Sequence, residues 1–260
     1  MLFLRRNFPF IFIPVSFAVA LLLVGGCSST TSVSTNDGTV TMQSQLATSD
    51  VNQMVVKGQV PTDLTFSSIV VTRVQVFIKD IKLHSDVEDT SKDDHDAEIK
   101  TGPFVMVFDS TGTHVVTTVT IPAGTYDRVK FELHKPNQND AADAAILAAY
   151  PDFVSGNQTY TVVIDGYTVS NGVRTYFRNR SISSKNFTLR FKDHDNQFSD
   201  LNNIVISGGS SMTLAFQFDP RLVFHIEGLL NGTMFDPRDT SHQKDIDDHV
   251  LIAIRLVKIS

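Results

Sequence analysis

The feature that most constrains the fold is an alternation of apolar and polar residues that recurs from Gln53 onward. Successive side chains of a strand point to opposite faces, so a period of two indicates half-buried β-strands. Between Val70 and Ile78 the apolar face is expected to hold Val70, Val74, Val76 and Ile78, with Arg73 and Gln75 opposite. Turn signals such as Asn171-Gly172 separate many of these runs, which predicts a mainly β chain folded as an antiparallel β-sandwich.

The phase of the alternation changes within this first strand. After Ile78 the apolar positions are Ile81 and Leu83, with Lys79-Asp80 between the two phases. A shift of one residue moves side chains to the other face of a strand, so we expect a β-bulge near Lys79-Asp80. Further strands are predicted at 103–108, 115–121, 127–134, 160–164, 173–177, 187–191, 204–206, 212–218 and 222–226.

Two segments are predicted to be helical. The first begins at Asn139 and Asp140, which can cap a helix, continues through alanines and stops before Pro151. The second is a C-terminal amphipathic helix, preceded by a possible capping box at 240–243. Its apolar face is expected to pack on the sandwich and to contain Ile246, Val250, Ile254 and Val257.

The N-terminus has the three parts of a secretory signal peptide. Arg5 and Arg6 supply positive charge, an apolar stretch follows from Phe8 to Val24, and two small residues, Gly25-Gly26, end it. A membrane-spanning helix is the alternative, because about 20 apolar residues can cross a bilayer. Pro14 interrupts the stretch and no basic cluster follows it, which favours a signal peptide over residues 1–26.

Cys27, the one cysteine in the chain, comes next. The segment Val24-Gly-Gly-Cys27 resembles the lipobox of bacterial lipoproteins, in which the cysteine receives a diacylglycerol and becomes the mature N-terminus. Stable anchoring takes more than one acyl chain, which lipobox processing supplies. The resemblance therefore implies a lipid-anchored protein of the bacterial cell envelope, and Ser28, where Asp would retain the protein in the inner membrane, favours the outer membrane.

Composition divides the remaining chain and limits its partners. Residues 27–50 are rich in Ser and Thr and are expected to form a flexible tether, with the folded domain over residues 51–260. The whole chain has 22 basic and 28 acidic side chains, and the signal peptide would remove two of the arginines. Phosphate contacts need a positive surface, so we expect no nucleic-acid partner. Attachment to the membrane should depend on the lipid and not on charge.

Three segments carry a resemblance to a known family. They are 69–78, the aromatic strand 104–108, and 119–133, which contains Pro122-Ala-Gly-Thr-Tyr126. Residues 65–135 resemble a family of uncharacterised bacterial lipoprotein domains, in which this Pro-Ala-Gly-Thr-Tyr motif is a hairpin that starts a strand. The resemblance implies a carbohydrate-binding-like, Ig-like or transthyretin-like β-sandwich, and it brings no established activity.

Two acidic patches share the sequence Asp-His-Asp, centred on His95 and His194. Carboxylate oxygens suit Ca²⁺, whereas imidazole with carboxylate suits Zn²⁺ or Cu²⁺. The second patch does not fit an EF-hand, because its sixth and twelfth positions are Phe198 and Ile204. If both loops lie at the same end of the domain, one calcium ion could be bound by Asp93, Asp94, Asp96, Asp193 and Asp195. The alternative is that both patches are solvated loops.

The sequence contains no recognisable catalytic motif. The serines at 207–211 do not form Gly-x-Ser-x-Gly, and they lie in an expected turn between strands. His225 and Glu227 would share one face of a strand, either as half of an acid–base site or as a polar surface pair. A hydrolase is therefore the less favoured hypothesis.

Binding is the favoured function class. Glycan-binding surfaces carry exposed aromatic side chains, and the chain has no Trp and five Tyr. Tyr167 and Tyr176 flank the expected hairpin at Asn171-Gly172 and are the candidates for a stacking platform. We expect a non-catalytic envelope module whose ligand is a glycan or another envelope protein.

Overall fold

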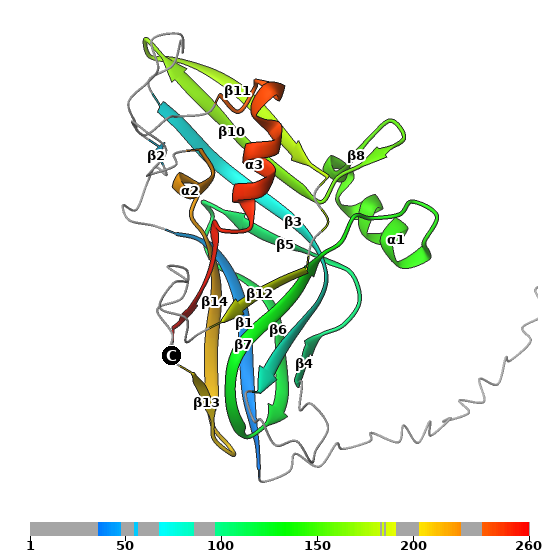
Figure 1. Ribbon diagram of the computed structural model, residues 1–260, viewed down its shortest axis with the longest axis vertical. Coiled ribbons are helices and arrows are strands. Elements are labelled where there is room, and N and C mark those ends of the chain that lie inside the picture. Colours follow the sequence, from blue (N-terminus) through cyan, green and yellow to red (C-terminus); the bar gives the residue numbers. More distant parts are fainter. Residues whose placement is uncertain are drawn as a thin grey trace, which may run out of the picture. The chain divides into compact units, whose positions relative to one another are not determined.

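The computed structural model describes residues 36–47, 55–56, 68–85, 97–182, 184, 186–190, 203–224 and 236–259 (Figure 1). This part of the chain is mainly β, with few and short helices. A four-stranded sheet has the order β15 (Ile254–Lys258), β14 (Ser211–Phe218), β1 (Asp37–Leu46), β6 (His114–Pro122). Among the described pairs, β1 with β14 is parallel and the others are antiparallel.

The larger sheet is built around the long strand β3 (Ser68–Ser85). Its path is β11 (Val173–Ser181), β10 (Val162–Ser170), β3, β7 (Gly124–Leu133), β12 (Asn186–Arg190). Within the described part of the chain, β3 is also the one partner of β2 (Val55–Val56), β4 (Ala97–Lys100) and β5 (Phe104–Asp109). Strand β13 (Ile204–Ile206) pairs with β7. Val76 pairs with β10 and β5, and Ile78 pairs with β7 and β5. Strands β10 and β7 therefore follow one another along the same edge of β3.

Two of the register shifts along β3 affect which of its side chains reach the core. The register between β3 and β7 shifts between Ile78 and Ile81, which confirms the bulge expected at Lys79-Asp80. A second shift lies opposite Asp165/Gly166 of β10, where a Cβ on Gly166 would stand 2.3 Å from the Val70 carbonyl oxygen. Because of this second bulge, Ile69 and Val71 belong to the main core where the alternation placed Val70.

The two sheets share one hydrophobic core. Phe131 of β7 packs edge-on against Phe216 of β14, with ring centroids 5.7 Å apart. The ring centroids of Phe108 in β5 and Phe218 in β14 are also 5.7 Å apart. Since each pair joins one sheet to the other, burial of these rings holds the sheets together.

Part of the expected tether is a central strand. Strand β1 covers Asp37–Leu46, pairs with both β14 and β6, and buries every second residue, including Val40, Met42 and Leu46. The prediction of a flexible tether over residues 27–50 is therefore wrong for this stretch. Its outward positions are Asp, Thr and Gln, a composition that resembles a linker. The apolar residues of the strand nevertheless recur with a period of two.

The Ala-rich helix is confirmed as α1 (Ala141–Ala149). Asp140 caps it by accepting hydrogen bonds from the backbone N–H groups of Ala142 and Asp143. The 3₁₀ turn η1 (Pro151–Phe153) and the hairpin of β8 (Val154–Ser155) and β9 (Gln158–Thr159) follow it. Leu147 of α1 and Phe153 of η1 pack on Phe77 and Val163, which covers part of the sheet face that points away from the main core.

The C-terminal helix is shorter than expected. Helix α3 (Gln243–Val250) includes Ile246 and Val250, but Ile254 and Val257 lie in β15. The expected capping box is also wrong, because 240–242 form the 3₁₀ turn η2 (Thr240–His242), whose cap is Asp239. Ile254 is buried as a strand residue, and its helical spacing from Val250 is a coincidence. No helix in the described part of the chain is both long and apolar enough to cross a membrane.

Two further expectations are corrected. The motif Pro122–Tyr126 is not a hairpin within one sheet, because β6 pairs with β1 and β7 pairs with β3, so the motif connects the two sheets. The expected strand at 222–226 begins instead with helix α2 (Arg221–Phe224). Asp219 accepts a hydrogen bond from the Arg221 N–H, and Pro220 precedes the helix, a combination that favours a helical turn.

Candidate functional site

Several predicted site residues lie outside the described part of the chain. They are Cys27, His225, Glu227 and the five metal candidates, Asp93, Asp94, Asp96, Asp193 and Asp195. The lipid anchor and the calcium site therefore stay predictions. Within the described residues no group of three or more His, Cys, Asp or Glu side chains is placed to hold a metal ion.

The two tyrosines expected to form a platform are neighbours with different roles. Tyr167 of β10 and Tyr176 of β11 are directly opposite in the antiparallel register, and their rings meet edge-on with centroids 5.7 Å apart. The hairpin joining them turns at Asn171-Gly172, both with positive φ, as the sequence predicted. Tyr176 is 73% exposed, whereas Tyr167 is 8% exposed. Only Tyr176 therefore offers a ring to a ligand.

Tyr176 belongs to a row of cationic side chains on β11. Arg174, Tyr176, Arg178 and Arg180 alternate along the strand, so they share the face opposite to Phe177 and Asn179. Phe177 and Asn179 face the other way, where Asn179 bonds to Gln243 of α3. We call the outer face of Arg174, Tyr176, Arg178 and Arg180 the arginine–tyrosine face.

Four charged side chains form an ion-pair network at the centre of this face. Asp165 of β10 accepts from Arg73 of β3 at 2.6 Å and from Arg178 of β11 at 2.6 Å. Asp152 of η1 accepts from Arg73 at 2.7 Å and also from Arg178. Burial works to raise the pKa of Asp165, but the hydrogen bonds from Arg178 and Arg73 outweigh burial and hold this pKa below its usual value.

The arginines at the two ends of the face have no acidic partner among the described residues. Arg174 stacks over the Tyr167 ring, 4.7 Å from its centroid. Arg180 donates to the backbone carbonyl of Asp152 and lies 5.3 Å from the centroid of Tyr160. Arg73 and Arg178 neutralise the charges of Asp152 and Asp165. The charges of the other two arginines are not neutralised by a described acid, so this face is locally positive although the protein is acidic.

A groove continues this face around β11. It has a volume of about 380 Å³ and is lined by Tyr160, Arg178, Arg180, Arg238 and other residues of β11 and η2. Strand β11 pairs with β10 and with no other described strand, so it is the edge of the described sheet. A groove beside an arginine-rich edge strand gives an extended ligand room to bind.

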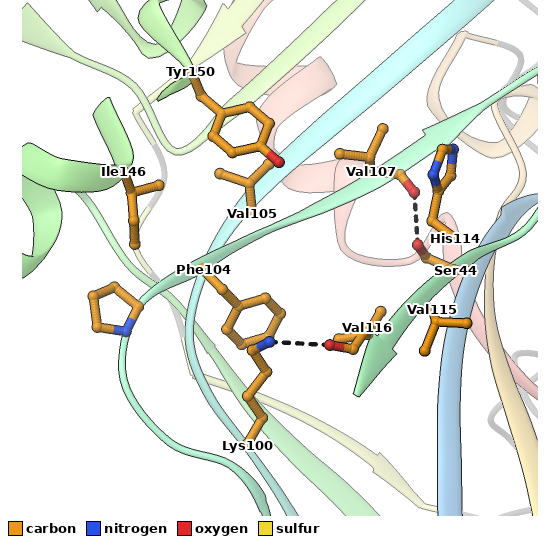
Figure 2. A pocket seen from close by; sticks show the side chains of 11 residues that line it. Ser44, Lys100, Phe104, Val105, Val107, His114, Val115, Val116, Ile146 and Tyr150 are labelled. Atoms are coloured by element: carbon orange, nitrogen blue, oxygen red, sulfur yellow. Dashed lines mark hydrogen bonds between the residues drawn. The ribbon is translucent and has the colours of Figure 1, made fainter. Parts of the chain in front are cut away.

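A second hollow lies between β5 and β6 (Figure 2). Its volume is about 350 Å³. Tyr150 and Ile146 line one side, and His114, Val115 and Val116 of β6 line the opposite side, with Phe104 between them. Lys100 of β4 lies over the Phe104 ring, with its Nζ 4.6 Å from the centroid.

This cavity contains the residue types of a nucleophilic triad. Ser44 and His114 are cross-strand neighbours, and His114 Nε2 lies 3.0 Å from Asp109 Oδ1, without the alignment of a hydrogen bond. Ser44, however, is fully buried and donates its hydroxyl hydrogen to the Val107 carbonyl at 2.6 Å. No hydrogen bond joins Ser44 to His114 in the described chain, so the base that would activate the serine is missing from this geometry.

The comparisons with known proteins found no relative of this chain. No protein-family model matches the chain. No curated protein matches it. No solved structure matches it either. The function is therefore inferred from the geometry of these two surfaces.

Tyr176 could be predicted from the sequence as a candidate ligand-binding residue, but the arginines around it were not predicted. The period-two run of Arg174, Tyr176, Arg178 and Arg180 is visible in the sequence and could have identified the face. The network with Arg73 could not be found in this way, because Arg73 and Asp165 are 92 positions apart. The cavity left no local signal either, since its lining comes from five separate elements.

Proposed function

We propose that this protein is a lipid-anchored, non-catalytic module of the bacterial cell envelope that binds an acidic glycan through its arginine–tyrosine face. The observation that carries the binding proposal is an exposed Tyr176 between two arginines, Arg174 and Arg180, that have no acidic partner in the described chain. The anchor is proposed from the lipobox at Cys27. The outer membrane is the proposed location because of Ser28.

The chemistry of the face favours an acidic glycan over a neutral one. An exposed tyrosine ring can stack on the apolar face of a sugar, and its hydroxyl can hydrogen bond. Guanidinium groups bind carboxylates through paired, charge-assisted hydrogen bonds. Strands rise about 3.3 Å per residue, so Arg174 and Arg180 lie about 20 Å apart along β11. That spacing suits an extended polymer with several acidic groups.

The proposed fold class is an Ig-like or transthyretin-like sandwich of the carbohydrate-binding kind. Its support is the shared core between the two sheets and the resemblance of residues 65–135 to uncharacterised lipoprotein domains. A catalytic role has less support, because the Ser44 hydroxyl donates its hydrogen bond to the Val107 carbonyl and, among the described residues, not to His114. An envelope protein is the competing ligand.

A glycan array tests the ligand class. We expect the purified full chain to bind acidic glycans, and Tyr176→Ala and Arg174→Gln each to weaken that binding about ten-fold, the effect of about 1.4 kcal/mol. Lys258→Gln, which removes an exposed cation on β15, is the control and should leave binding unchanged. Preference for neutral glycans, or equal binding by all variants, contradicts the proposal. Specific capture of an envelope protein with no glycan bound favours the competing ligand.

The anchor is tested separately at Cys27. In a bacterial host, Cys27→Ala should remove the lipid mass and leave an uncleaved or soluble chain, and globomycin should block processing of the wild type. The measurement is membrane fractionation with intact mass spectrometry. Unchanged mass and fractionation in the variant would refute the anchor without affecting the binding face.

A further inference from the structure

We infer that the cavity between β5 and β6 is a binding site for a small apolar carboxylate, with Lys100 as the residue that recognises the carboxylate group. The site is separate from the arginine–tyrosine face, since its lining comes from β1, β4, β5, β6 and the end of α1. Failure of one proposal leaves the other standing.

The walls of the cavity suit an apolar body. Phe104, Val105, Val116 and Ile146 contribute hydrocarbon surface, and the volume of about 350 Å³ lies at the small end of ligand pockets. Pockets that bind small molecules combine such walls with a few converging polar groups. Here the polar groups are Lys100, Tyr150 and His114, which line the cavity from different parts of the chain (Figure 2).

Lys100 is a cation with no carboxylate partner among the described residues. Its Nζ donates to the Val116 carbonyl at 3.0 Å and lies over the Phe104 ring, contacts that leave two ammonium hydrogens without an acceptor among the described residues. Lys79 and Lys82 of β3 instead have carboxylate partners in Glu132 and Glu98. A partly buried ammonium group facing a cavity is stabilised by an anion there.

The other polar groups near the cavity also favour a carboxylate as the ligand. The Tyr150 hydroxyl has no described hydrogen-bond partner and can donate to a ligand oxygen. Asp109 lies 3.0 Å from His114 Nε2 and accepts hydrogen bonds from the Thr111 N–H and hydroxyl groups, so this carboxylate is already paired. A phosphate would bring more charge into apolar walls than one ammonium group balances, whereas a carboxylate brings a single charge.

Calorimetric titration of the full chain with 4-phenylbutyrate and its neutral analogue 4-phenylbutanamide tests the inference. We expect one acid to bind per chain, about ten-fold more tightly than the amide, because a hydrogen bond between two ionised groups is stronger than one to a neutral amide. Lys100→Met keeps most of the aliphatic stem and should reduce acid affinity to that of the amide. Lys100→Arg keeps the charge and should retain the preference.

Two controls isolate the site. Lys258→Met removes a cation from β15, and Arg174→Gln removes one from the arginine–tyrosine face, and both should bind the acid as the wild type does. Equal affinity for acid and amide in the wild type overturns the inference, as does an acid preference that survives Lys100→Met in a variant that melts like the wild type. If Lys100→Met does not fold, the wild-type comparison and Lys100→Arg decide the question.

Discussion

Asp165 shows how one side chain can join three adjacent strands. It lies on β10 and accepts hydrogen bonds from Arg73 on β3 and Arg178 on β11. The same carboxylate orients Arg178, whose pKa is raised mainly by its hydrogen bond to Asp165. The network therefore holds the centre of the arginine–tyrosine face in place and leaves Arg174 and Arg180 available to a ligand.

This arrangement predicts a pH-dependent contribution to stability. The pKa of Asp165 is lowered in the folded chain, so its stabilising effect is complete above the unfolded-state value of about 3.9 and is lost as the pH falls through the lower folded-state pKa. Asp165→Asn should lower the free energy of unfolding by about 1–3 kcal/mol at pH 7, and this difference should shrink below about pH 4.

Urea unfolding at pH 7 and pH 3 measures that difference. Glu98→Gln is the control, because the Glu98 side chain is 59% exposed and its ion pair with Lys82 should contribute little. An Asp165→Asn effect of the same size at both pH values would mean that the residue acts through packing and not through charge.

At the scale of the element, β1 is the clearest difference between expectation and structure. Because Met42 is fully buried in this strand, Met42→Ala should lower the free energy of unfolding by about 2–5 kcal/mol, as for other large-to-small changes in a core. Gln43→Ala, one residue along and on the outward face, should change it by less than about 0.5 kcal/mol. Equal, small effects in chemical denaturation would restore the tether interpretation for this stretch.

The elements that the sequence predicted well are those whose signal is local. Alternation in 104–109, the bulge at Lys79-Asp80, and Asp140 and Pro151 at the two ends of α1 all act within a few residues. In β1 the outward Thr and Gln residues hid the strand. In α2, Asp219-Pro220 outweighed the apolar pattern, which alone cannot separate a short helix from a strand.

The candidate sites were less predictable for a related reason. Tyr176 could be proposed from its place beside a turn, but the contact between Arg73 and Asp165 depends on the pairing of β3 with β10. The cavity likewise requires β5 and β6, which belong to different sheets, to approach each other. Such juxtapositions come from the tertiary fold, and a single sequence carries no local sign of them.

At the scale of the whole molecule, the calcium site stays a prediction from the sequence. Binding of Ca²⁺ by Asp93, Asp94, Asp96, Asp193 and Asp195 would stabilise the folded chain by mass action. Millimolar calcium should then raise the melting temperature, and a chelator should lower it. Replacing Asp93 and Asp193 by Asn should remove the response. A melting curve indifferent to both additions would contradict the site.

The arginine–tyrosine face is proposed to bind an acidic glycan. Amide hydrogen exchange locates the bound glycan, when it is measured on the full chain with and without the acidic glycan that binds best on the array. We predict slower exchange in 162–181, the segment of β10 and β11, and a smaller change in Tyr176→Ala at the same glycan concentration. Saturable binding that slows exchange only elsewhere in the chain, with 162–181 unaffected, would contradict the claim.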